Sequence, residues 1–107
     1  MDLLLIDVRN YLHITWIDAN TDKNLIDAIN SSKKRLQEIA GVTSIDFAIE
    51  GLARDLLKDR CRYINSQALE MFEKNFASEL MALHIKSQVD AYVPDVIVWK
   101  LKQTLSL

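Results

Sequence analysis

The sequence predicts a small all-α domain, and three observations lead to this fold class. The chain has 107 residues, a length that suits one domain with a single core. Hydrophobic residues make up 50% of it and charged residues 26%, an ordinary composition for a folded protein. It contains only two glycines and one proline, too few turn residues for a many-stranded sandwich or barrel. We therefore expect a bundle of about four helices with a long antiparallel helical hairpin at its centre.

The first half of the chain predicts two helices. One covers residues 4–14, with an apolar side of Leu5, Val8 and Leu12. The polar segment 18–22 then turns the chain, and Thr21 is a suitable N-cap for a second helix. Gly41 stands where a left-handed residue commonly closes a helix. The apolar residues between these two points follow helical spacing: Leu25, Ile29, Leu36, Ile39 and Ala40.

A third helix is predicted from Ser44, as N-cap, to about Asn65. Its apolar stripe consists of Ile45, Ile49, Leu52, Leu56 and Leu57, widened by Phe47, Ala48, Ala53 and Cys61. Gly51 then falls in the middle of the helix, at a cost of roughly 1 kcal/mol relative to alanine. Either that cost is tolerated or a neighbouring helix approaches closely there.

The strongest amphipathic pattern begins after Ser66 and continues to about Ala91. Apolar residues recur there at intervals of three and four: Leu69, Phe72, Phe76, Leu80 and Leu83. Two long helices with a short connection pack most easily as an antiparallel hairpin. We expect the third and fourth helices to form the central hairpin.

Pro94 interrupts this pattern, which divides the chain into a helical domain, 1–92, and a tail, 93–107. The tail is rich in β-branched residues, which favours a strand with Ile97, Trp99 and Leu101 on one side. A short helix starting at Pro94 would instead align Ile97, Leu101 and Leu105. Both possibilities remain open.

The sequence offers no set of residues for catalysis or for cofactor or metal binding. His13 and His84 are the only histidines, and neither has metal-ligand spacing to the lone cysteine, Cys61, which we expect to be an inert core residue. With two glycines, a phosphate-binding loop is excluded. Glu70 and Glu73 fit a solvated charged face better than an acid and base pair. We expect no enzyme activity and no cofactor.

Charge and hydropathy exclude two further classes. The formal net charge of −2 and the pI of about 5.6 give no basic surface of the kind that binds nucleic acid. The basic run 33–35 is interpreted as ordinary surface. No stretch of about 18 apolar residues is present, so no membrane span is expected. The single cysteine and the absence of a signal-type N-terminus favour an intracellular origin.

The two tryptophans are candidates for contacts with other proteins, because tryptophan is enriched at interface anchors. We expect Trp16 to cover one end of the core. Trp99 stands among Val96, Ile97, Val98 and Leu101 and would expose an apolar patch unless it docked on this domain or on another chain. Docking on another chain is the favoured alternative.

Four sequence blocks also carry a resemblance to a known family. Residues 7–14 read DVRNYLHI, with Trp16 and 21–22 behind them, and 35–41 read RLxxIxG. Residues 46–63 read DFxxEGxARxLLxDxxRY, and 68–80 read ALxxFExNFxxEL. Over residues 3–85 the chain resembles the head-tail connector (head completion) proteins of tailed bacteriophages, the adaptor family often labelled as DNA packaging proteins.

This resemblance implies a structural subunit of the virion, made in the host cytoplasm. Such subunits are small helical bundles that form a ring of twelve or thirteen copies beneath the portal of the DNA-filled capsid. The implied partners are identical neighbours, the portal and a tail-side stopper or adaptor. DNA passes through without sequence-specific binding, which suits an acidic subunit, and no membrane is involved.

The candidate interface residues lie in two segments, which are Arg54, Arg60, Arg62 and Tyr63 in the third helix and Val96, Ile97, Val98 and Trp99 in the tail. We hypothesise that the tail docks on the portal or on a neighbouring subunit by adding a strand. The alternative function is a small bacterial helical regulatory or adaptor domain that binds another protein.

Overall fold

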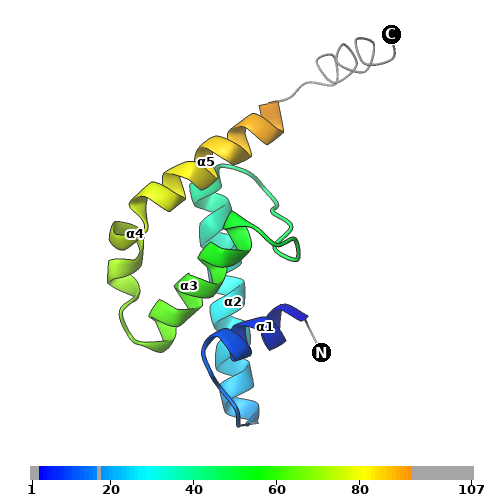
Figure 1. The fold of residues 1–107 in the computed structure, drawn as a ribbon, viewed down its shortest axis with the longest axis vertical. Helices are drawn as coiled ribbons and strands as arrows, with labels where there is room; N and C mark the ends of the chain where they lie inside the picture. Colours follow the sequence, from blue (N-terminus) through cyan, green and yellow to red (C-terminus); the bar gives the residue numbers. More distant parts are fainter. Residues whose placement is uncertain (1–2, 17, 93–107) are drawn as a thin grey trace.

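The computed structural model describes residues 3–16 and 18–92, and over these residues the chain is all-α (Figure 1), which confirms the predicted fold class. In chain order the helices are α1 (Leu3–Tyr11), α2 (Ala19–Ala40), α3 (Leu52–Asn65), the short 3-10 helix η1 (Leu69–Met71), α4 (Phe72–Asn75) and α5 (Ala77–Tyr92). No described helix combines the length and the apolar character needed to cross a membrane.

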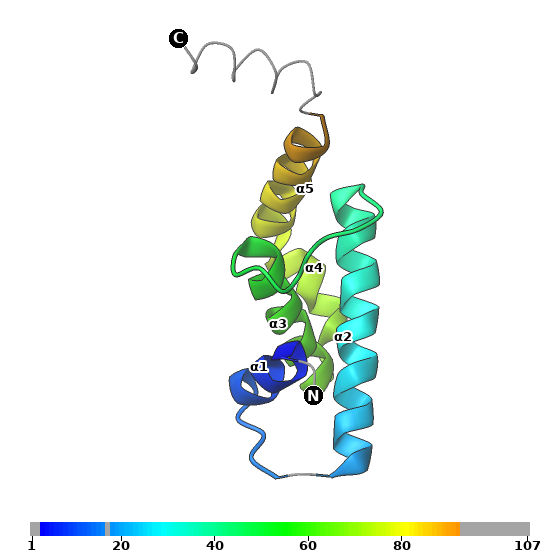
Figure 2. The same ribbon diagram turned by 90° about the vertical axis from the view of Figure 1, so that its right-hand side faces the viewer.

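The central element is α2, which contacts α1, α3 and α5. Figure 2 shows the other helices gathered on one side of it. The prediction that a hairpin of the third and fourth helices lies at the centre of the fold is therefore not confirmed. The core between the helices is formed by Leu4, Leu5, Val8, Ile14, Leu25, Ala28, Ile29, Leu36, Ala40, Phe47, Leu56, Leu57, Cys61, Phe72, Leu80 and Leu83.

The start of α2 differs from the prediction, whereas its end agrees with it. The N-cap is Asp18, whose carboxylate accepts a hydrogen bond from the Thr21 backbone N–H at 3.3 Å. Thr21 therefore lies inside the helix and is not its cap. Gly41 closes α2 with φ of 74°, and its N–H donates to the Gln37 and Glu38 carbonyl oxygens, as expected of a left-handed cap.

α1 and α3 are both shorter than predicted. α1 ends at Tyr11, and His13 takes a left-handed conformation with φ of 58°, which no continuing helix allows. α3 begins at Leu52, because Gly51 has φ of 154° and ψ of −165°, a conformation that side-chain-bearing residues rarely adopt. Gly51 is thus the N-cap residue, and residues 42–51 form a loop rather than the first turns of the helix.

The predicted fourth helix is broken into η1, α4 and α5. The break at Phe76 lies beside a cluster of three aromatic rings. Phe72 stacks on Phe76 with ring centroids 5.0 Å apart, and Tyr63 of α3 meets both rings edge to face at 5.6 Å. Edge-to-face and offset ring pairs of this kind are favourable beyond their buried area. The bend places both phenylalanines against one tyrosine and turns α5 towards the end of α2.

Candidate protein interface

The four α3 residues that the sequence singled out do not form one surface. Arg54 is half-buried: its Nε donates to the Asp7 carboxylate at 3.0 Å and its Nη1 donates to the Ala48 carbonyl oxygen at 2.9 Å. Lys58 Nζ lies 3.4 Å from the same Asp7 oxygen. Arg54 therefore joins α1 and the 42–51 loop to α3 and is not available as a free contact.

Arg60 is only 7% exposed, so its assignment to an interface is wrong. Its Nη1 donates to the hydroxyl oxygens of Ser31 and Ser32 at 3.2 and 3.0 Å, and its Nε has no hydrogen-bond partner in the described part of the chain. Burial lowers the pKa of the guanidinium. The signal in the sequence was Ser32, a polar residue on the side of α2 that buries Ile29 and Leu36.

Arg62 and Tyr63 are the two candidates with some exposure. Arg62 is exposed, 3.4 Å from the Asp59 carboxylate, and its guanidinium lies 5.0 Å from the Tyr63 ring centroid. The Tyr63 ring packs in the aromatic cluster, and its hydroxyl accepts a hydrogen bond from the Asn75 amide at 3.0 Å. Arg62 is thus the one predicted arginine with an exposed charge. Val96, Ile97, Val98 and Trp99 lie outside the described residues.

Other charged groups noted in the sequence form ion pairs across the fold. Arg35 of α2 donates two hydrogen bonds, of 2.9 and 2.8 Å, to the Glu73 carboxylate of α4. It donates a third, of 3.2 Å, to the Glu38 carboxylate. These contacts raise the pKa of Arg35, and the same hydrogen bonds lower the pKa of Glu73. Within the basic run 33–35, Arg35 therefore joins α2 to α4.

The described residues contain no group of three or more histidine, cysteine or acidic side chains able to hold a metal ion. Cys61 is fully buried, 3.8 Å from the Ser32 hydroxyl, and burial raises the pKa of its thiol to about 11. At neutral pH that thiol is protonated and a poor nucleophile. The expected burial of Cys61 is confirmed.

Trp16 does not cover the core as expected, since 56% of it is exposed. Its indole N–H donates to the Thr21 hydroxyl at 3.3 Å, and its backbone carbonyl accepts a hydrogen bond from Arg9. The ring lines a shallow groove of about 630 Å³ together with Leu12 and Leu69. Trp16 is therefore held mainly through its backbone and leaves its ring largely at the surface.

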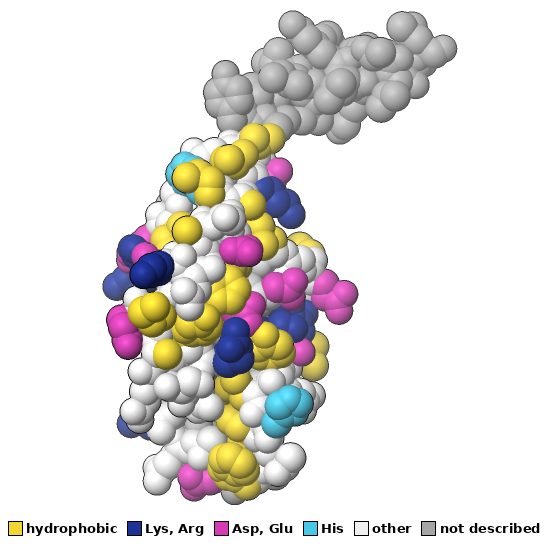
Figure 3. Space-filling model, turned by 60° about the vertical axis from the view of Figure 1, so that its left-hand side comes forward, with side chains coloured by type: hydrophobic (Ala, Val, Ile, Leu, Met, Phe, Trp, Pro, Cys, Tyr) yellow, Lys and Arg dark blue, Asp and Glu magenta, His cyan; other side chains and the backbone are white. Residues whose placement is uncertain are grey.

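An apolar stripe lies on the exposed side of α5, and we call it the α5 stripe: Met81, Ile85 and Val89. These residues follow one another at intervals of four and are 59%, 55% and 56% exposed. Hydrophobic side chains reach the surface at this end of the molecule in Figure 3. The opposite side of α5 buries Leu80 and Leu83. The helix is thus apolar on two sides, and among the described residues only one of them is covered.

The stripe was visible in the sequence but was missed. The prediction followed the pattern from Leu69 to Leu83 and assigned it to the core. A second apolar series starts one position after Leu80 and continues past Leu83, at residues 81, 85 and 89. A helix with two apolar stripes exceeds what one core needs, which is the signal that marks a contact surface.

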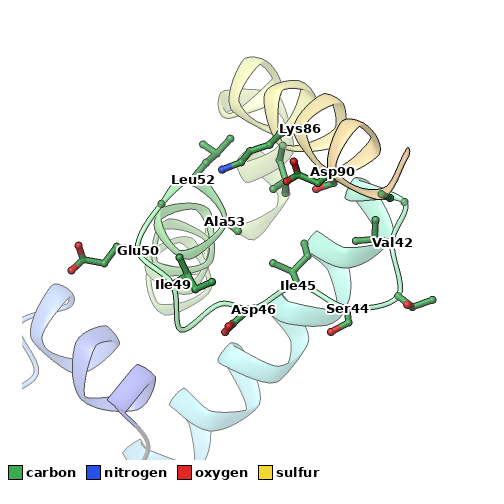
Figure 4. A pocket seen from close by; sticks show the side chains of 16 residues that line it. Val42, Ser44, Ile45, Asp46, Ile49, Glu50, Leu52, Ala53, Lys86 and Asp90 are labelled. Atoms are coloured by element: carbon green, nitrogen blue, oxygen red, sulfur yellow. The ribbon is translucent and has the colours of Figure 1, made fainter. Parts of the chain in front are cut away.

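Beside α5 lies a groove of about 690 Å³, which we call the α5 groove (Figure 4). The 42–51 loop and the start of α3 form one wall, and the last turns of α5 form the other. Its apolar lining includes Val42, Ile45, Ile49, Leu52 and Leu83. Its charged lining consists of Asp46, Glu50, Asp90 and Lys86. The arrangement suits an apolar chain segment better than a small polar ligand.

The chain matches no family model, no curated protein and no solved structure.

Proposed function

We propose that this protein is a structural subunit of a phage head-tail connector, which forms a ring beneath the portal of the DNA-filled capsid and joins it to tail-side proteins. The resemblance of residues 3–85 supports the family. The single observation that carries a role in assembly is the α5 stripe, an apolar helix face with no partner within the described chain.

The α5 stripe has the form of a helix-docking site. Apolar anchors at positions i, i+4 and i+8 lie one above another on a helix and fit the groove of a partner surface. Burying that surface stabilises a complex by roughly 25 cal/mol per Å² before the costs of association are subtracted. We assign the stripe to the contact with a neighbouring subunit.

A ring requires two different surfaces on each subunit, because heterologous contacts close into a ring and self-complementary ones stop at a dimer. The stripe is one surface. We place the second surface around Arg62, which is exposed near the C-terminal end of α3. We propose that the tail-side partners also contact this end of α3. The acidic net charge leaves DNA free to move past such a ring.

The test is light scattering coupled to size exclusion, on the full chain alone and then mixed with the portal protein encoded in the same genome. A ring, or co-elution with the portal, supports the connector proposal. A protein that stays monomeric and does not bind the portal contradicts the proposal and favours the alternative, a small bacterial helical regulatory or adaptor domain. That alternative uses the same stripe for a different protein partner.

A further inference from the structure

The α5 groove lies where the undescribed end of the chain begins. Ala91 and Asp90 line the groove, and the chain leaves α5 at Tyr92, one residue later. Residues 93–107 follow, a length of fifteen residues with Pro94 near its start. A proline at that point favours a change of direction over a continued helix. The segment therefore starts at the rim of an open apolar groove.

The length of the segment matches the groove. The α5 wall from Leu83 to Ala91 spans about 12 Å at 1.5 Å of rise per residue. Residues 96–102 span about 20 Å when extended, or about 9 Å when helical. After a reversal over residues 92–95, an extended segment is long enough to cover the whole wall, and a helical one covers about three quarters of it.

The chemistry of the segment matches the groove as well. Residues 96–99 are Val, Ile, Val and Trp, and the groove presents Val42, Ile45 and Ile49 to them. Lys100 and Lys102 follow without an acidic neighbour, whereas three acidic side chains and one lysine form the charged lining. An apolar, basic segment thus meets an apolar, acidic groove.

We propose that the α5 groove is the docking site for residues 96–102 of the same chain. The segment is attached at the groove rim, which gives it an effective concentration of the order of millimolar, far above that of a free second copy. The docked segment covers Ile49, which is 66% exposed, and removes Trp99 from water. This contact does not depend on the connector function, because it forms within one subunit.

The first experiment is disulfide trapping in the full chain with the double variant Ile49→Cys, Trp99→Cys. Native Cys61 is buried with a raised thiol pKa and does not compete. At low protein concentration we expect most of the oxidised variant to be a monomer that has lost both introduced free thiols. The matched control is Ile26→Cys, Trp99→Cys, since Ile26 is an exposed isoleucine on α2 away from this groove. The control should stay reduced.

Two outcomes would overturn the proposal. One is equal trapping in both variants, or none in either. The other is a disulfide that forms only between molecules when single variants Ile49→Cys and Trp99→Cys are mixed, which would assign the segment to a neighbouring copy. Neither outcome concerns portal binding, so the connector proposal is tested separately, by light scattering with the portal protein.

A second experiment avoids any new covalent bond. In a Trp16→Phe background, Trp99 is the only tryptophan, and acrylamide quenching reports its exposure. Docking predicts a quenching constant several-fold below that of the unfolded chain, and Ile49→Glu should raise it towards the unfolded value by placing a charge in the groove. The loop position of Ile49 leaves the core intact. A Trp99 as exposed as in the unfolded chain would contradict docking.

Discussion

The two ends of α2 hold their neighbours in different ways. At the N-terminal end, α1 is joined to α2 by the Arg9–Asp22 ion pair and to α3 by Arg54 and Lys58, which share Asp7. At the C-terminal end, α5 is joined by two hydrogen bonds to α2 carbonyl oxygens. His84 Nδ1 donates to Ile39 at 2.9 Å and Gln88 Nε2 donates to Ala40 at 2.8 Å.

The comparison shows that α1 and α5 are attached to the rest of the fold by different kinds of contact. Around α1, charged side chains are paired across three helices, and these ion pairs fix α1 to both α2 and α3. Around α5, the attachment is narrow: two leucines face the core, and no described residue covers the α5 stripe on the other side. Segments with few buried contacts have low local stability, so they can change conformation or bind a partner more easily than the core.

The largest effect should come from the covered side of α5. Leu83→Ala removes a leucine that is only 3% exposed and should lower the free energy of unfolding by about 2–5 kcal/mol. Ile85→Ala, two positions away on the exposed stripe, should change it by less than about 0.5 kcal/mol. Urea unfolding followed by circular dichroism measures both. Similar losses for the two variants would mean that α5 is packed on both sides.

The glycine at the C-terminal end of α2 should come next. Gly41→Ala forces a side chain into the left-handed region at a cost of about 1–2 kcal/mol. Its Cβ would also lie 2.7 Å from the Gln88 amide nitrogen, so the side chain that joins α5 to α2 must move. A double-mutant cycle with Gln88→Ala should therefore show coupling. Strict additivity would separate the cap from the α5 attachment.

A matched pair of aspartates tests the other end of the comparison. Asp7→Asn removes the charge shared by Arg54 and Lys58 and should destabilise the fold by about 1 kcal/mol, since the site is half-buried. Asp55→Asn removes an exposed carboxylate 4.0 Å from Lys58 and should change stability by only a few tenths of a kcal/mol. Thermal unfolding at low and high salt measures both. An equal, salt-independent change would contradict an ionic anchor at α1.

A pH dependence of stability is expected from the buried thiol. Burial raises the pKa of Cys61 to about 11, above its ordinary value of 9.0. A raised pKa in the folded state contributes stability below pH 9 that is lost as pH rises towards 11, because the unfolded chain releases its proton first. The stability difference between wild type and Cys61→Ala should shrink from pH 8 to pH 10.5. A constant difference would place the thiol in contact with water.

The sequence predicted the parts of this fold that depend on local rules. The all-α class, the Gly41 cap and the burial of Leu25, Ile29 and Leu36 follow from spacing and composition and agree with the structure. Helix periodicity is a local property, so it needs no knowledge of the neighbouring elements.

The parts that failed depend on tertiary contacts. Residues 45–49 have helical spacing, yet Phe47 is buried and Ile49 exposed in a loop, since the conformation of Gly51 ends any helix there. Arg60 was assigned to the surface because arginine usually is, and only the serines across the α2–α3 interface explain its burial. The aromatic cluster at Phe76 breaks a helix that its own sequence would continue.

The central claim is that the α5 stripe is a subunit interface, and light scattering on matched isoleucine variants tests it most directly. Ile85→Glu places a charge on the stripe, and Ile26→Glu places the same charge on an exposed isoleucine of α2. If the account is correct, Ile85→Glu stays a folded monomer and fails to join the ring or the portal, whereas Ile26→Glu assembles like wild type. Full assembly of Ile85→Glu would contradict the account.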